Sequence, residues 1–250
     1  MTQLSPKQRE IQQREMTILG EARRILLNRG YFGLTMEGVA RASECPKGTM
    51  YQRFGCKEDL VLALAVESLE RRLAMMYRAA AYPGVSRERV AALGEGVALF
   101  AQLNPDDSRI VHSATGPIRE KASPDRLEAL IRAERAVVEI LKGILEDGVR
   151  DGDLVVNDSA HLNEMAFGIW ALVDGSYTLI ESGATLNTLG LSNPIIGMYH
   201  VFNVLADGYG WRPLFHEHDW EATLADIRRT IFPEESEELY GPGNWHGDKA

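Results

Sequence analysis

Hydrophobic residues recur at the spacing of an α-helix along almost the whole chain. The clearest stripe lies within residues 57–81 and consists of Leu62, Val66, Leu69, Leu73 and Met76. Intervals of three or four residues place such side chains on one face of a helix. No segment shows a sustained alternation of apolar and polar residues between turn signals, which is the pattern of a half-buried strand. The pattern therefore predicts an all-α protein.

Helix start and stop signals divide the first part of this pattern into short and long helices. The first helix is expected over residues 7–29 and ends at Gly30. Thr35 has the side chain of an N-cap for a short second helix that ends at Ala42. Pro46 opens a third short helix that ends near Phe54, since proline suits the first helical turn. A longer helix then begins at Lys57 and ends before Pro83-Gly84.

The rest of the chain predicts further helices and a polar tail. The expected helices cover residues 86–103, 107–121 with a break at Pro117, 124–150, 158–182, 194–207 and 219–232. From Pro233 the sequence is rich in Gly, Pro and Glu, which predicts disorder. We therefore expect an N-terminal three-helix head at 1–56, an antiparallel helical bundle at 57–232 connected to it by the helix 57–81, and a flexible tail at 233–250.

Composition and targeting signals favour a cytoplasmic location. Two cysteines are too few for a disulfide framework, and the N-terminus lacks the apolar stretch of a secretory signal peptide. The most apolar window, residues 166–180, is shorter than the roughly 20 residues of a bilayer span and contains Asp174. We therefore expect no membrane association.

Charge is spread unevenly along the chain. The formal net charge is −9, but residues 1–60 hold ten Lys and Arg against seven Asp and Glu. The head therefore carries +3, and the remaining residues carry −12. A mildly basic head on an acidic body permits phosphate binding at one end of the chain.

Two short helices joined by a tight turn and braced by a preceding helix match the helix-turn-helix plan. The residues that sharpen this match are Gly30-Tyr31, Thr35, Val39-Ala40, Lys47-Gly48-Thr49-Met50-Tyr51, Phe54 and Lys57-Glu58-Asp59-Leu60. This segment resembles the DNA-binding signature of the TetR family of transcriptional regulators.

The resemblance implies partners and an assembly. It implies a homodimer with two N-terminal heads and a helical body that contains a pocket for a small molecule, whose identity the sequence leaves open. Dimerisation would use mainly the helices 158–182 and 194–207. Such a dimer would bind a palindromic stretch of double-stranded DNA with its two recognition helices in successive major grooves, and members of this family usually act as repressors.

Seven residues of the head are predicted to contact DNA. Lys47, Thr49, Gln52 and Arg53 lie on the predicted recognition helix, where their donors and acceptors suit base edges or nearby phosphates. The Tyr51 hydroxyl can hold a phosphate, and Thr35 and Lys57 stand at helix starts, where unpaired amides favour anions. Val39, Ala40, Cys45, Met50 and Phe54 are better explained as the small core of the head.

The turn between the two short helices departs from the family pattern. Ser43-Glu44-Cys45-Pro46 stands where Ala-Gly-Val-Ser is more common. Without the turn glycine, Glu44 is expected to adopt an unfavourable backbone conformation close to the phosphate side. Pro46 presets φ at the start of the recognition helix but offers no side-chain acceptor.

In the body, polar or aromatic residues on otherwise apolar helices are candidates for the ligand pocket. They are Phe100, His112, Trp170, Asp174 and Tyr177. The alternatives are core packing for each of them, dimer-interface packing for Trp170 and Tyr177, and a hydrogen bond between helices for Asp174.

Other groupings have simple explanations beside functional ones. Cys45 and Cys56 flank the recognition helix and could form a thiol switch, or Cys45 could be a buried apolar residue and Cys56 a chance substitution. His216 and His218 with Asp219 could bind a metal, or form a polar loop before a helix cap. We expect the second explanation in both cases, and therefore no metal site.

The sequence holds no Walker A loop, GxSxG, HExxH or strand-flanked GxGxxG motif. We therefore expect no catalytic residues, no cofactor other than a small-molecule effector, and no enzyme activity. The leading hypothesis is a ligand-responsive, dimeric regulator. The alternative, motivated by Glu44 and the modest charge of the head, is a ligand-binding or interaction module that has lost DNA binding.

Overall fold

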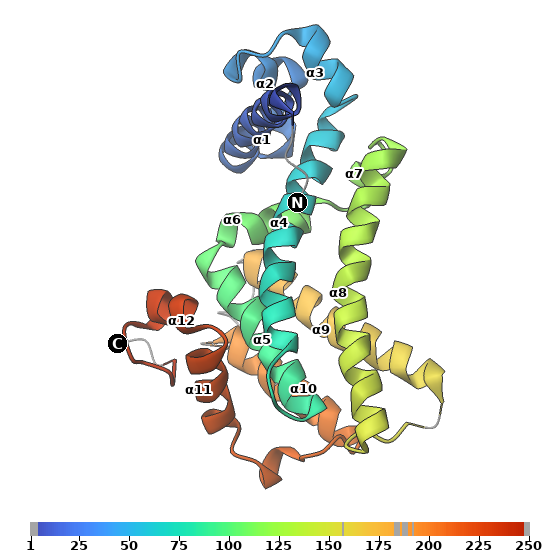
Figure 1. The fold of residues 1–250 in the computed structure, drawn as a ribbon, viewed down its shortest axis with the longest axis vertical. Coiled ribbons are helices and arrows are strands. Elements are labelled where there is room, and N and C mark those ends of the chain that lie inside the picture. The colour runs from blue at the N-terminus through green and yellow to red at the C-terminus, as the bar shows by residue number, and fades with distance from the viewer. Residues whose placement is uncertain (1–4, 157, 183–185, 187–189, 192, 248–250) are drawn as a thin grey trace. The chain divides into compact units, whose positions relative to one another are not determined.

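A computed structural model describes residues 5–156, 158–182, 186, 190, 191 and 193–247. The described residues form helices and connecting turns without strands, which confirms the all-α prediction. Figure 1 shows the helices α1 (Pro6–Gly33), α2 (Met36–Ala42), α3 (Lys47–Arg53), α4 (Lys57–Ala80), α5 (Ser86–Leu103), α6 (Pro105–Ser113), α7 (Gly116–Arg119), α8 (Pro124–Asp151), α9 (Ser159–Ser182), α10 (Pro194–Gly208), the 3-10 turn η2 (Phe215–Glu217), α11 (Trp220–Thr230) and α12 (Pro233–Tyr240).

The chain forms two compact units. The first combines residues up to Glu70 with Asp106–Ala133, and the second combines Arg71–Pro105 with the residues from Glu134 onward. These limits differ from the expected boundaries after residues 56 and 232. The first unit takes the first part of α4, nearly all of α6, α7 and the first part of α8 in addition to the three N-terminal helices.

Local signals explain the first helix of the head. Ser5 and Gln8 form a capping box at its start, with the Ser5 side chain accepting from the Gln8 amide at 3.2 Å. The buried side chains of α1 are Ile18, Leu19, Ala22, Ile25 and Leu26. Gly30 has φ 65°, so the regular helix is interrupted at the predicted stop and one further turn follows.

Two buried carboxylates hold the later segments of the first unit to its N-terminal helices. Asp59 on α4 accepts from the backbone amides of Gly55 at 2.9 Å and Ser123 at 2.7 Å. Asp107 on α6 accepts from Ser68 at 2.8 Å and forms an ion pair with Arg23 of α1. These contacts explain why residues 106–133 belong to the first unit.

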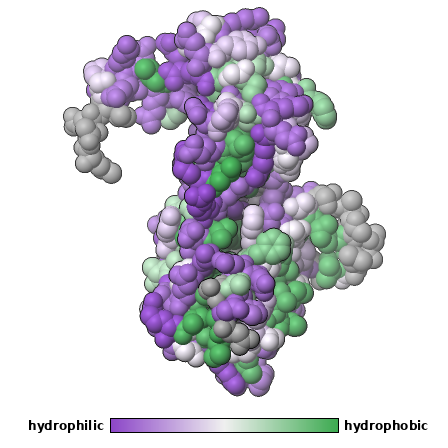
Figure 2. Space-filling view, turned by 90° about the vertical axis from the view of Figure 1, so that its right-hand side faces the viewer, coloured by the Kyte–Doolittle hydropathy of each residue, from purple (hydrophilic) through white to green (hydrophobic). Residues whose placement is uncertain are grey.

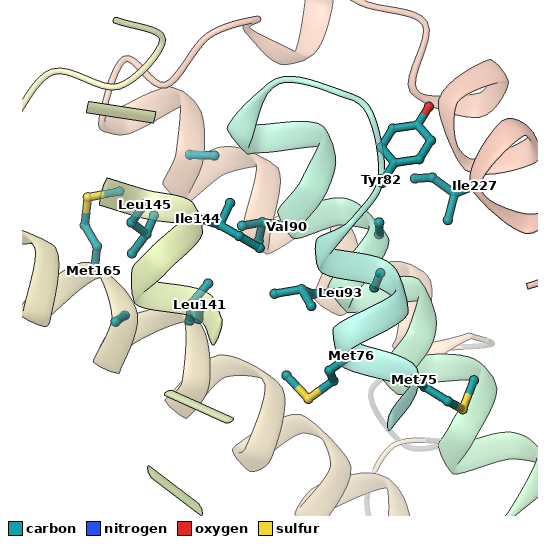
Figure 3. Packing of buried hydrophobic residues seen from close by; sticks show 14 of the residues in the cluster. Met75, Met76, Tyr82, Val90, Leu93, Leu141, Ile144, Leu145, Met165 and Ile227 are labelled. Atoms are coloured by element: carbon teal, nitrogen blue, oxygen red, sulfur yellow. The ribbon is translucent and has the colours of Figure 1, made fainter. Parts of the chain in front are cut away.

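The second unit is built around α5. Figure 3 shows how side chains of α4, α5, α8, α9 and α11 meet in one hydrophobic cluster, among them Met76, Leu93, Leu141, Met165 and Ile227. Helix α5 packs against α11 and α12, and α9 packs against α10. Interdigitation of such side chains is the main stabilising contribution to a helical body.

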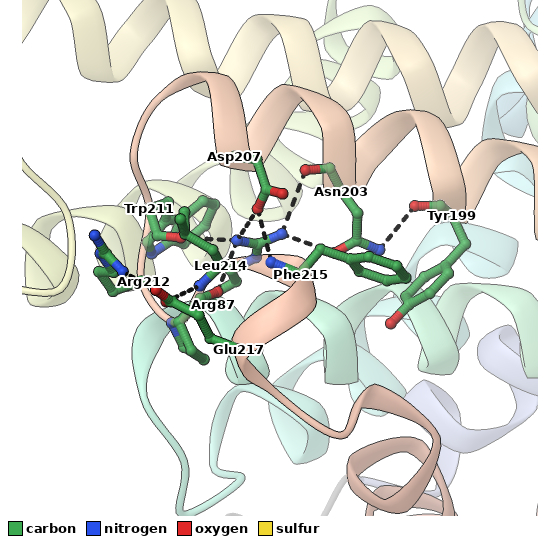
Figure 4. Close-up of polar contacts among 10 residues, drawn as sticks. Arg87, Tyr199, Asn203, Asp207, Trp211, Arg212, Leu214, Phe215 and Glu217 are labelled. Atoms are coloured by element: carbon green, nitrogen blue, oxygen red, sulfur yellow. Dashed lines mark hydrogen bonds and ion pairs between the residues drawn. The ribbon is translucent and has the colours of Figure 1, made fainter.

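Arg87 of α5 fixes α10 and the segment after it. Its side chain is fully buried and donates to Asp207 at 2.7 Å, to Asn203 Oδ1 at 2.9 Å and to the carbonyls of Trp211 and Pro213, each at 2.7 Å (Figure 4). Burial works to raise the pKa of Asp207, but the hydrogen bonds from Arg87 and the Phe215 amide, together with the charge of Arg87, hold it below its ordinary value. This network satisfies a charge that would be costly to bury unpaired.

The prediction of a disordered tail is wrong for its described part. Residues 233–240 form α12, with Phe232 and Ser236 completely buried. Arg78 of α4 forms an ion pair with Glu235. The high content of Glu and Gly led to the prediction of disorder, although the segment contains a short helix with one buried face. Pro233 occupies the first turn of this helix, a position that suits proline.

Candidate nucleic-acid interface and ligand cavity

Helices α2 and α3 form a braced pair in the first unit. The Thr35 hydroxyl accepts from the Gly38 amide at 3.1 Å, so the predicted N-cap of α2 is confirmed. The residues predicted as the core of the head are all buried: Val39, Ala40, Cys45, Met50 and Phe54. Because these side chains fill the space between the helices, the direction of α3 is fixed by packing.

The turn between α2 and α3 has the expected backbone strain. Glu44 has φ 51°, and among the residues that the structure describes it is the one non-glycine with a positive φ. Such a conformation costs an L-residue about 1–2 kcal/mol. Pro46 stands at the N-cap of α3 without a side-chain hydrogen bond, also as expected.

Three of the predicted DNA-binding residues lie on α3 and are exposed to solvent. Lys47, Tyr51 and Gln52 are exposed, and Thr49 on the same helix is half-buried. The Tyr51 hydroxyl donates to Glu37 at 3.2 Å. Desolvation and this hydrogen bond raise the pKa of Tyr51, so the hydroxyl stays a donor.

The other two basic residues on the predicted list have partners inside the head. Arg53 donates to Glu15 of α1 at 3.3 Å. The Lys57 ammonium lies 3.9 Å from the centre of the Tyr31 ring and donates to the Tyr31 carbonyl at 3.2 Å. Both side chains therefore stabilise the head in this structure.

Sequence reasoning missed a residue of α8 that completes the contacts of Arg53. Arg126 donates to the other oxygen of Glu15 at 3.2 Å and lies over the Phe54 ring at 4.7 Å. No local spacing indicates this cluster, because its members are separated by 38 and 111 positions in the chain.

The second unit contains a cavity of about 220 Å³. It is lined by residues of α4, α5, α8, α9, α10 and α11, most of them apolar, such as Met76, Leu93, Leu141, Phe202 and Leu224. Its polar lining residues are Arg72, Glu95, Asp174, Tyr199 and Arg228. A largely apolar wall with a few polar groups is the usual composition of a small-molecule site.

Two of the five predicted pocket residues lie on this wall. Trp170 and Asp174 of α9 line the cavity. Phe100 packs in the hydrophobic core, Tyr177 is buried away from the cavity lining, and His112 belongs to the first unit. Apolar helices bury aromatic residues for packing as readily as for binding, so sequence alone could not separate these roles.

The cavity wall carries charged groups of both signs. Among them, Arg72 has a buried Nε without a hydrogen-bond partner in the described part of the chain. Arg228 donates to both carboxylate oxygens of Glu95, at 2.7 and 3.2 Å. Burial lowers the pKa of Arg72, and the nearby Asp174 carboxylate partly offsets this effect. Among the charged wall residues that sequence reasoning missed, Glu95 offered a signal, because it interrupts the apolar pattern of α5.

Helices α9 and α10 expose large apolar side chains. The most exposed are Val204 at 71%, Phe167 at 66% and Leu179 at 58%. On the face drawn in Figure 2, hydrophobic groups gather over the second unit. Trp170 and Ile196 line the cavity and are also exposed, so the cavity opens on the surface of these two helices.

The described residues form neither a metal-binding cluster nor a helix that could span a membrane. Nowhere in this part of the chain do three or more His, Cys, Asp or Glu side chains gather as a metal site would require. None of its helices combines the length and apolarity that crossing a bilayer requires.

Residues 18–64, which include the whole α2–α3 pair, match the family described as "Bacterial regulatory proteins, tetR family". This segment of the chain therefore matches the DNA-binding domain of the TetR family. No curated protein matches the sequence significantly.

Solved structures share the TetR fold at low sequence identity. A regulatory protein of the TetR family from Rhodococcus RHA1 is 18% identical, with a TM-score of 0.59 over 79% of this chain and 97% of its own. The regulator FadR from Bacillus subtilis in complex with stearoyl-CoA is 16% identical, with a TM-score of 0.59 over 78% and 98%. PfmR from Thermus thermophilus is 17% identical, with a TM-score of 0.57 over 75% and 96%.

Proposed function

We propose that this TetR-family protein is a cytoplasmic, ligand-responsive repressor that binds a palindromic operator as a homodimer. The observation that carries the proposal is the exposed face of α3. Lys47, Tyr51 and Gln52 project from a short helix whose direction is fixed by a buried core. In a helix-turn-helix domain this is the helix that enters the major groove.

The exposed apolar residues of α9 and α10 support the homodimer. Phe167 and Val204 are large apolar side chains that are mostly exposed in the single chain. Exposed apolar patches of this kind commonly mark a protein–protein interface. A symmetric pair of heads then requires an operator whose half-sites are related by a two-fold axis.

The cavity of the second unit supports control by a ligand. A small molecule that binds one conformation of the body more tightly than another shifts the population of DNA-binding dimers by its differential affinity. The similar FadR structure was obtained in complex with stearoyl-CoA, so a small-molecule ligand suits this fold. No chemical catalysis is required for this role.

The test is binding of the purified, full-length protein to DNA upstream of its own gene, measured by fluorescence anisotropy at several salt concentrations. We expect binding that weakens steeply with salt and that the Lys47→Ala variant reduces. Lys142→Ala on α8, far along the chain from the head, is the matched control. Absence of binding to every upstream fragment at low salt would contradict the proposal.

A second function is favoured by one specific observation, the acidic Glu44 in the strained turn beside α3. A carboxylate close to the phosphate backbone opposes DNA binding. If the protein binds small molecules but no DNA at low salt, the ligand-binding module is the correct description.

A further inference from the structure

Arg72 of α4 brings an incompletely satisfied cation to the wall of the cavity. Its Nε is buried and has no hydrogen-bond partner among the residues that the structure describes. None of the ion pairs between described residues includes Arg72, and the residue as a whole is half-buried. Because a guanidinium carries five N–H donors, this one can still receive an acceptor from outside the chain.

The other arginine on the cavity wall already has its acceptors. Arg228 donates to both carboxylate oxygens of Glu95, at 2.7 and 3.2 Å, and to the Trp245 carbonyl at 3.0 Å. A bidentate arrangement of this kind satisfies an arginine and a carboxylate together. The contrast makes Arg72, and not Arg228, the cation of the wall that a bound molecule can complete.

The surroundings compensate the charge of Arg72 only in part. Burial lowers the pKa of this guanidinium and outweighs the attraction of the nearby Asp174 and Glu134 carboxylates. An arginine nevertheless keeps its proton at neutral pH, so the cost of burying the charge remains. A ligand carboxylate beside Arg72 would reduce this cost and would gain charge-assisted hydrogen bonds.

The rest of the lining determines the body of the molecule. Met76, Leu93 and Leu141 line the cavity and belong to one hydrophobic cluster (Figure 3). A cavity of about 150 Å³ accepts benzene. The present cavity of about 220 Å³ therefore suits a molecule of on the order of ten non-hydrogen atoms. Most of these atoms must be apolar, because the lining is.

We infer that the cavity binds a small monocarboxylate with an apolar body, and that its carboxylate accepts hydrogen bonds from the Arg72 guanidinium. This inference rests on the proposed role of the cavity as the effector site. It adds the chemical class of the effector and the residue that recognises it.

The test is isothermal titration calorimetry of the full-length protein with three probes. Octanoate, octanamide and octylammonium have similar alkyl tails and carry a negative, a neutral and a positive head group. We expect octanoate to bind at least about tenfold more tightly than octanamide, because only octanoate supplies a charge opposite to that of Arg72. Octylammonium should bind more weakly than either, since it adds a second cation beside the first.

Arg72→Met keeps an unbranched side chain but removes the cation. It should weaken octanoate binding at least about tenfold and leave octanamide binding within about twofold. Arg71→Met is the matched control, because Arg71 is the exposed neighbour on α4 and does not line the cavity. It should leave the affinity for octanoate unchanged. Arg72→Met should melt no lower than Arg71→Met, since the charge that it removes is incompletely compensated.

Four results would overturn the inference. They are no binding of octanoate, octanamide or octylammonium binding as tightly as octanoate, equal effects of the two methionine variants on octanoate, and loss of octanamide binding together with octanoate binding in Arg72→Met. The last result would mean that Arg72 shapes the cavity and does not recognise a charge.

DNA binding measured on the same preparation distinguishes these failures from failure of the proposed function. A protein that binds its operator but rejects octanoate remains a regulator with a different effector.

Discussion

Glu15 of α1 accepts a hydrogen bond from Arg53, the last residue of α3, at 3.3 Å. The two side chains are 31% and 24% exposed, so water weakens but does not abolish their attraction. Arg53 therefore stabilises the head through Glu15. In the proposed complex with DNA, a phosphate would compete with Glu15 for this guanidinium.

Release of Arg53 should strengthen DNA binding. Glu15→Gln removes the competing charge, and we expect operator affinity at low salt to rise by up to about fivefold. The slope of log affinity against log salt should steepen by about one phosphate contact. Glu10→Gln is the control. Glu10 lies exposed on the same helix, and its ion pair within the described residues is with Arg14 and not with Arg53. Equal behaviour of the two variants would show that Arg53 does not reach DNA.

The strained turn should be improved by the residue that the family usually has there. Glu44→Gly removes the cost of a positive φ, and we expect about 1 kcal/mol of added stability in thermal unfolding. Glu44→Gln keeps the strain but removes the charge. Both variants should bind DNA more tightly, while only the glycine variant should melt at a higher temperature. A glutamine variant as stable as the glycine variant would argue against strain.

Asp59 should make stability depend on pH in the acid range. Burial works to raise the pKa of this carboxyl, but hydrogen bonds from Ser123 and Gly55 outweigh it and hold the pKa below its ordinary value. The stabilising contribution is therefore complete above the unfolded pKa of about 3.9 and is lost as pH falls through the folded value. In urea unfolding, Asp59→Asn should be less stable than wild type at neutral pH, and the difference should shrink toward pH 3.

The control for this comparison is Asp125→Asn, at an exposed position in the first turn of α8. It should reproduce the wild-type pH profile. If Asp59→Asn also reproduces that profile, the two backbone amides do not stabilise the ionised carboxylate as the geometry indicates.

The apolar surface of α9 and α10 should control the oligomeric state. Light scattering should give twice the mass of the chain for wild type. Val204→Glu places a charge on the most exposed apolar position of α10 and should yield monomers that bind the operator at least about tenfold more weakly. Val155→Glu is the control, because Val155 is 79% exposed but lies outside both helices. A dimeric Val204→Glu variant would place the interface elsewhere.

Local chemistry made most of the fold predictable. Thr35 caps the start of α2, Gly30 interrupts α1, and Pro46 precedes the first residue of α3. Each of these residues affects only the backbone a few residues away, so its effect can be predicted from the local sequence. The positive φ of Glu44 also followed from local reasoning, because a turn that normally takes glycine had received another residue.

The candidate sites were less predictable because they depend on contacts between distant segments. The polar side chains of the cavity come from different helices, and no spacing brings Arg72 and Tyr199 to one wall. Likewise, the Glu15 contact removes Arg53 from the solvent-exposed set although its sequence position suits base reading. Periodicity shows which face is buried, but it does not show which other helix covers that face.

The helix α12 extends the folded part of the second unit beyond residue 232. Phe232 and Ser236 are completely buried, and the Trp245 carbonyl accepts from Arg228, a residue of the cavity wall. A chain cut at residue 233 would therefore lose part of the support of the cavity together with α12. Truncation boundaries, affinity tags and fusion partners at this end of the chain belong beyond residue 247.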